Sequence, residues 1–107
     1  MTDATRMLVV WCPDWAVVAA GLGLDVPAAV VRANRIVACT PVAREEGVAV
    51  HQRRRDAQAR CPELVLVNDD PARSARAFEP VAQAVETLAP WLEVIHPGCC
   101  AVPTRGP

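Results

Sequence analysis

Leu8-Val9-Val10-Trp11-Cys12-Pro13-Asp14-Trp15 is the stretch of this sequence that decides the fold. It begins with a short apolar run rich in valine, which is typical of a buried strand, so we expect such a strand over 7–11. Pro13 suits the first position of a helix, and Asp14 favours its positive end. A helix is therefore predicted from Asp14 to about Leu22, ended by the glycines at 21 and 23.

Beyond this stretch, short strands and helices alternate. Two β-branched segments, 28–33 and 35–40, flank Asn34 in the pattern of a hairpin with a tight turn. The positions of proline and glycine then predict a helix over 41–46, a helix over 52–60 and a strand over 64–67.

The longest helix is predicted to begin at Asp70-Pro71, an N-cap followed by a proline at the first helical position. Apolar residues recur along it at helical spacing, at Ala75, Phe78, Ala82, Val85 and Ala89. Pro80 lies inside this helix and should kink it or delay its regular part. Apolar runs over 92–95 and 99–102 flank Pro97-Gly98 and predict a final hairpin. This order of elements indicates an α+β fold.

Composition narrows the class of protein. The chain has 107 residues, of which 52% are hydrophobic and 21% charged, which indicates one globular unit. The formal net charge is −1 and all 11 basic residues are arginine, so any contact with nucleic acid has to be local. The polar segment 1–5 is not a secretory leader, and no apolar run is long enough to span a membrane. We therefore expect a cytoplasmic protein whose five cysteines are reduced thiols.

The last residues of the sequence bear on how the sheet is closed. An apolar strand comes directly before Arg105-Gly106-Pro107, with no further element to close the sheet. We therefore expect an open sheet edge and interpret residues 1–107 as a single partial unit, either an N-terminal fragment or a truncated product.

Four stretches carry a family resemblance: 11–17, 38–48, 57–67 and 92–101. The strongest match is Ala43-Arg44 followed by Gly47-Val48. Together the four stretches resemble the N-terminal part of the Y-family translesion DNA polymerases, the DinB/UmuC superfamily, and within it most of all the catalytically inactive ImuB type. The resemblance implies a mixed sheet with helices packed on it, divided into a palm strand and helix at 7–24, a fingers-like part at 25–68 and a palm-like helix and hairpin at 69–104. The rest of the palm, the thumb and the little finger lie outside these residues.

The resemblance places the family's metal-binding carboxylates on Cys12, Gly98 and Cys99. Polymerases hold two magnesium ions with hard oxygen ligands, and thiols are poor partners for magnesium. Asp14 keeps the second acidic position of the opening motif, but one carboxylate cannot assemble a two-metal site. The resemblance therefore implies a chain without catalysis, metal or cofactor. Cys99, Cys100 and His96 lack the spacing of a zinc site, and buried structural thiols are expected there instead.

The nucleotide-binding positions of the family are also changed. The triphosphate-contacting tyrosine falls on Pro41 and the aromatic sugar gate on Val17. Arg44 matches the phosphate-contacting arginine; it could hold a phosphate or form a helix-surface salt bridge with nearby glutamates. Four further arginines form the dense basic patch of the chain, either as contacts to DNA phosphates or as a solvated face: Arg53, Arg54, Arg55 and Arg60.

By resemblance, the chain is a scaffold in damage-induced translesion DNA synthesis and mutagenesis. Its implied partners are DNA and, for full-length relatives, the sliding clamp, an error-prone replicative-type polymerase and a RecA-like accessory protein. One alternative is a single-cysteine redox protein centred on Cys12, because a helix N-terminus lowers the pKa of a thiol. Another is a residual nucleotidyltransferase that combines Asp14 with Asp69 or Asp70. A decayed reading frame without function is a third.

Overall fold

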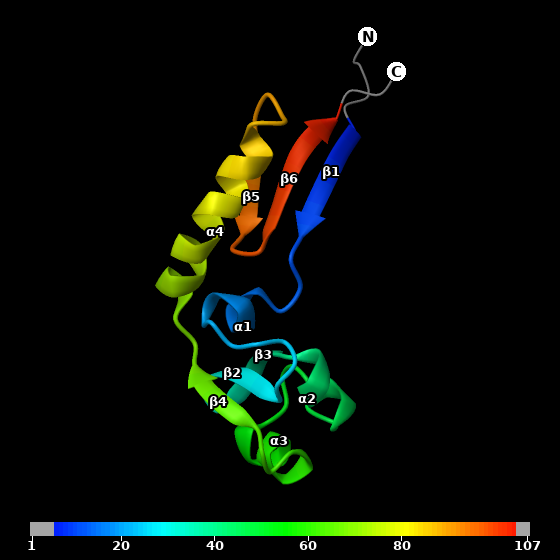
Figure 1. Cartoon of the computed structure of the whole chain (residues 1–107), viewed down its shortest axis with the longest axis vertical. Helices are drawn as coiled ribbons and strands as arrows, with labels where there is room; N and C mark the ends of the chain where they lie inside the picture. Colours follow the sequence, from blue (N-terminus) through cyan, green and yellow to red (C-terminus); the bar gives the residue numbers. More distant parts are fainter. Residues whose placement is uncertain (1–5, 105–107) are drawn as a thin grey trace.

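Two separate three-stranded sheets lie at opposite ends of an elongated molecule, which measures 56 × 25 × 24 Å in this computed structural model (Figure 1). The structure describes residues 6–104. The elements are β1 (Arg6–Trp11), α1 (Trp15–Ala19), β2 (Ala28–Arg32), β3 (Arg35–Cys39), α2 (Pro41–Glu45), α3 (Arg54–Arg60), β4 (Val65–Asn68), α4 (Pro71–Glu86), β5 (Glu93–His96) and β6 (Cys99–Thr104). The predicted α+β class is confirmed, although the single mixed sheet is in fact two sheets.

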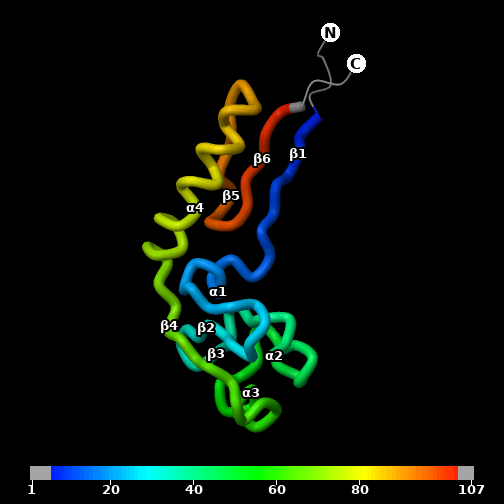
Figure 2. Tube along the Cα trace, viewed as in Figure 1, coloured from blue at the N-terminus to red at the C-terminus, as the bar shows by residue number. Residues whose placement is uncertain are grey.

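The first sheet joins the two ends of the described chain. Its order is β1-β6-β5 and both pairings are antiparallel, so β1 from the start of the chain lies beside β6 from its end (Figure 2). Helix α4 runs along this sheet (Figure 1), and an apolar groove of about 430 Å³ separates the end of α4 from Leu8 and Val10.

The prediction that strand 7–11 is buried is wrong. Leu8, Val9 and Trp11 expose 52%, 55% and 67% of their surface. The reason is the place of β1 in the sheet: within the described residues it pairs with β6 on one side and has no strand on the other. A short apolar run predicts a strand, but burial depends on neighbours that the run does not specify.

The second sheet has the order β3-β2-β4, with β2 antiparallel to β3 and parallel to β4. The hairpin predicted around Asn34 is confirmed. Ala33 and Asn34 have φ angles of 50° and 63°, and two successive positive φ angles are what a type I′ turn requires. This turn fixes the position of Arg35 at the start of β3.

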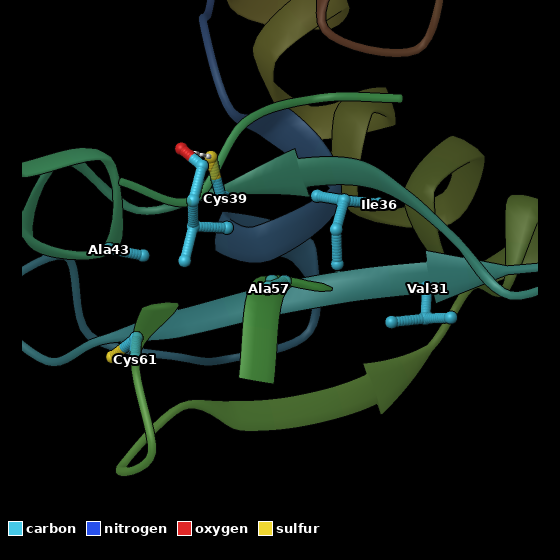
Figure 3. Close-up of a cluster of buried hydrophobic side chains, with 8 residues drawn as sticks. Val31, Ile36, Cys39, Ala43, Ala57 and Cys61 are labelled. Carbon is cyan, nitrogen blue, oxygen red and sulfur yellow. Dashed lines mark hydrogen bonds between the residues drawn. The ribbon is translucent and has the colours of Figure 1, made fainter. Parts of the chain in front are cut away.

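Both faces of the second sheet are covered. On one face, Ile36 and Cys39 meet Ala43 of α2 and Ala57 of α3 in a cluster of fully buried side chains (Figure 3). On the other face, Val17 of α1 packs with Val30 and Ala38. Because successive strand residues point to opposite faces, β2 and β3 supply side chains to both clusters. This half of the molecule therefore contains a closed core.

Several helix boundaries differ from the prediction. Helix α1 ends at Ala19 rather than near Leu22, and α3 begins at Arg54 rather than at residue 52. Helix α1 begins at Trp15 rather than Asp14, because Asp14 adopts a left-handed conformation with a φ of 61° and serves as the N-cap residue. Helix α4 has the predicted cap, in which the Asp70 carboxylate accepts a hydrogen bond of 3.1 Å from the Arg73 amide, and it continues through Pro80. It ends at Glu86, before Ala89. In the described part of the chain, no helix has the length and apolarity needed to cross a membrane.

Candidate functional site

The three positions that the resemblance assigns to metal-binding carboxylates lie together where β1 ends. The Cys12 amide donates a hydrogen bond of 2.6 Å to the Gly98 carbonyl, and Trp11 is paired with Cys99 across β1 and β6. We call the group formed by Cys12, Trp15, Gly98 and Cys99 the Gly98 site. The fold therefore brings together residues that are far apart in the sequence.

Gly98 is held in a conformation and a space that suit glycine alone. Its φ angle is 95°, which side chains rarely tolerate. A β-carbon placed on Gly98 would lie 2.5 Å from the β-carbon of Trp15 and 3.3 Å from the Cys12 carbonyl oxygen. The space that a carboxylate side chain would need at position 98 is therefore filled by Trp15.

Trp15 is itself fixed by helix α4. Its indole Nε1 donates a hydrogen bond of 2.9 Å to the Ser74 carbonyl, and its ring meets Phe78 edge to face with centroids 5.3 Å apart. An edge-to-face aromatic pair adds stability beyond its buried area. No local pattern in the sequence reveals the contact of Trp15 with Gly98, because it joins segments that are far apart in the chain.

The Gly98 site does not fit the two magnesium ions of the family polymerases. Cys12 and Cys99 present thiols, Cys99 is buried, and Gly98 has no side chain. The neighbouring Cys100 is fully buried, and this burial raises the pKa of its thiol, so the neutral form is favoured. Magnesium requires oxygen ligands in near-octahedral geometry, which these residues do not supply.

Arg44 forms a bidentate ion pair with Asp14. The two guanidinium nitrogens lie 2.7 and 3.1 Å from the two carboxylate oxygens, and one of them also donates to the Cys39 carbonyl at 2.9 Å. The hydrogen bonds that Arg44 donates to the Asp14 carboxylate raise the pKa of Arg44. The sequence left open a phosphate contact or a salt bridge with nearby glutamates; the partner in the structure is Asp14, which joins the start of α1 to α2.

The residues at the other nucleotide-binding positions, and the remaining acidic candidates, have structural roles in the fold. Pro41 is exposed at the first position of α2, and Val17 is fully buried against the second sheet. The remaining carboxylates of the nucleotidyltransferase alternative are separately engaged: Asp69 lies 3.5 Å from Arg32, and Asp70 caps α4.

The redox alternative relied on a helix N-terminus at Cys12. Helix α1 starts at Trp15 and has only five residues, so Cys12 precedes the helix and even its N-cap residue, Asp14. The thiol is half-buried at the end of β1. The electrostatic reason for an activated Cys12 is therefore weaker than the sequence suggested.

A second candidate site is a groove of about 510 Å³ between the β2–β3 turn and the start of α3. It is lined by Ala33, Asn34, Arg35, Arg53, Arg54, Arg55 and Gln58, and we call it the arginine groove. Three of the four predicted patch residues line it. Arg60 does not line the groove; its side chain lies beside Gly47, which follows helix α2. Arg35 was missed, because the antiparallel bridge that places it opposite Arg53 joins segments that are far apart in the sequence.

A comparison with protein families indicates a polymerase-like domain of the Y-family type. Residues 17–102 match the model of the impB/mucB/samB family, and the chain belongs to that family. The family links the chain to translesion DNA synthesis and mutagenesis. Among curated proteins, none matches the sequence significantly.

Proposed function

We propose that this chain is a non-catalytic, ImuB-type member of the family that acts as a cytoplasmic scaffold in damage-induced translesion DNA synthesis. The observation that carries the proposal is the contact between Trp15 and Gly98. It supports the loss of catalysis more strongly than the sequence does, because the position of a missing carboxylate is also occupied by another side chain.

The electrostatics around α1 support the same proposal. A polymerase needs an arginine free to hold the incoming triphosphate, and the matching Arg44 is already bound by Asp14 through both carboxylate oxygens. Such bidentate pairs are among the stronger hydrogen-bonded contacts in proteins. A nucleotide would have to displace Asp14 before it could bind Arg44.

The partners are proposed from the family resemblance. We propose contact with DNA and, in full-length relatives, with the sliding clamp, an error-prone replicative-type polymerase and a RecA-like accessory protein. A scaffold has to bind its partners without turning over nucleotides, which is consistent with a blocked metal site and a separate, open basic surface.

Primer extension tests the proposal directly. The purified chain is incubated with a fluorescent primer on a template, all four deoxynucleotides and either magnesium or manganese. We expect no extension, and any trace product should be identical for the wild type and Asp14→Ala. Extension that Asp14→Ala abolishes would identify a working nucleotidyltransferase and overturn the proposal.

A further inference from the structure

We propose that the arginine groove binds consecutive phosphates of a DNA strand. The groove presents four guanidinium groups, from Arg35 at the start of β3 and from Arg53, Arg54 and Arg55 at the start of α3. The choice of DNA as the ligand rests on the proposed function; the affinity of the groove for phosphate rests on the geometry and charge described next.

The backbone fixes the spacing of the arginines. The segment before α3 lies antiparallel to the start of β3, with Arg35 and Arg53 opposite each other. The Ile36 amide donates to the Gln52 carbonyl at 2.9 Å, and the Arg54 amide donates to the Asn34 carbonyl at 2.8 Å. The four side chains therefore start from positions held by hydrogen bonds rather than from a flexible loop.

The charge of the groove is uncompensated within the described part of the chain. The side chains of Arg53, Arg54 and Arg55 make no ion pair or hydrogen bond with residues 6–104, and the Arg35 guanidinium donates only to the His51 carbonyl, at 3.1 Å. No carboxylate is among the residues that line the groove. Arginine stays protonated at every physiological pH, so four like charges face one another and an anion would relieve their repulsion.

The shape and chemistry favour a strand of phosphates over a single small anion. The planar guanidinium matches phosphate oxygens in a bidentate way, and several such groups along one groove suit several phosphates in sequence. The chain as a whole has a net charge of −1, so a polyanion would be drawn to this groove and not to the molecule in general. The same chemistry would also accept the triphosphate of a free nucleotide, which the experiment has to distinguish.

The experiment measures binding of a fluorescent single-stranded oligonucleotide to the full chain by anisotropy at several salt concentrations. The groove variant is Arg54→Gln with Arg55→Gln. The control is Arg60→Gln with Arg76→Gln, which removes the same charge from exposed positions outside the groove. We expect the groove variant to bind about tenfold more weakly than the wild type, and the control to bind almost as well. Circular dichroism verifies that both variants are folded.

The salt dependence gives a second readout. Each lost phosphate contact lowers the slope of log affinity against log salt by about 0.7 for a single strand, so the groove variant should lose about 1.4 in slope. An equal effect of the two double variants would show a general charge effect and overturn the proposal. Binding of a deoxynucleoside triphosphate to the groove, without affinity for the oligonucleotide, would also overturn it.

The two proposals can fail independently. If the wild type extends primers and the groove variant alone loses DNA affinity, the scaffold proposal fails and the groove stands. If no extension occurs and both double variants bind DNA equally, the groove proposal fails and the loss of catalysis stands.

Discussion

The Gly98 site and the arginine groove differ in the charge of the side chains that form them. At the Gly98 site, the positions that the resemblance assigns to carboxylates hold two thiols and a glycine, and Trp15 fills the remaining space. In the arginine groove, four cations line an open surface without a carboxylate among them. The first region is packed like a core, and the second is arranged like a binding surface.

This difference indicates that the residues of the Gly98 site stabilise the fold, whereas the residues of the arginine groove are available for binding. Residues of a packed site contribute to folding, so changes there should lower the free energy of unfolding. Residues of a charged, exposed groove add little to stability, and their repulsion opposes folding slightly. Substitutions in the two regions should therefore affect different measurements.

The largest effect is expected from Gly98→Asp, which introduces the acidic residue type that the resemblance assigns to this position. An aspartate at a φ of 95° whose β-carbon collides with Trp15 should cost about 3 kcal/mol or more of the free energy of unfolding. Urea unfolding followed by circular dichroism measures the loss. The variant should also gain no primer-extension activity.

Gly21→Asp is the matched control for this change. Gly21 also has a positive φ, of 77°, but nothing lies within 4 Å of a β-carbon there. It should cost only the conformational penalty, about 1 kcal/mol. If Gly21→Asp and Gly98→Asp are equally destabilising, the contact with Trp15 is unimportant and the packed interpretation of the Gly98 site is wrong.

A second, smaller effect is expected from Arg44→Gln. The substitution removes a bidentate partner and leaves the Asp14 carboxylate, only 14% exposed, without its cation. Because the Arg44 side chain is 45% exposed, solvent screening reduces the loss to about 2 kcal/mol.

A double-mutant cycle with Asp14→Asn isolates the ion pair. The combined variant should be less destabilised than the sum of the single variants, because the second substitution has no pair left to break. Strict additivity would contradict a direct Arg44–Asp14 interaction.

The free energy of unfolding should depend on pH above neutrality because two thiols are buried in the folded state. Burial raises the pKa of Cys39 and of Cys100, so both stay neutral in the folded state when the unfolded thiols, near 8.5, begin to ionise. The stabilising contribution is complete below that pH and is lost as pH rises toward the folded-state pKa values. We expect a fall of about 1 kcal/mol between neutral pH and about pH 9.

Cys39→Ala and Cys100→Ala provide the comparison for that measurement. Each variant should show a flatter decline of the free energy of unfolding above neutral pH than the wild type. A wild-type profile that stays level through this range would contradict the protection of the Cys39 and Cys100 thiols.

Local signals in the sequence predicted most of the secondary structure. Asn34 marked the hairpin turn, Pro41 marked the start of α2, and Asp70-Pro71 marked the start of α4. Each signal acts within a few residues of the chain: a positive φ angle at the turn, a proline ring that fixes φ, or a side chain that caps a helix. Such contacts form wherever the same short sequence occurs, so a linear pattern can reveal them.

The features that define the two sites are long-range, and the sequence did not reveal them. The Gly98–Trp15 contact, the Arg44–Asp14 pair and the place of Arg35 beside Arg53 all depend on how distant segments pack. The exposure of β1 is missed for the same reason. The resemblance did identify Cys12, Gly98 and Cys99 as one group, because a family alignment carries the distant contacts of the family's fold.

The smallest effect on stability is expected from substitutions in the arginine groove, which should have the largest effect on DNA binding. Arg54→Gln with Arg55→Gln should change the free energy of unfolding by no more than about 0.5 kcal/mol, because both side chains are exposed and unpaired with residues 6–104. At low salt the change should be slightly stabilising, since two of four repelling charges are removed, and it should vanish as salt screens them. A large destabilisation in urea unfolding would mean that these arginines hold the fold together, and the contrast between a packed site and a binding groove would then be lost.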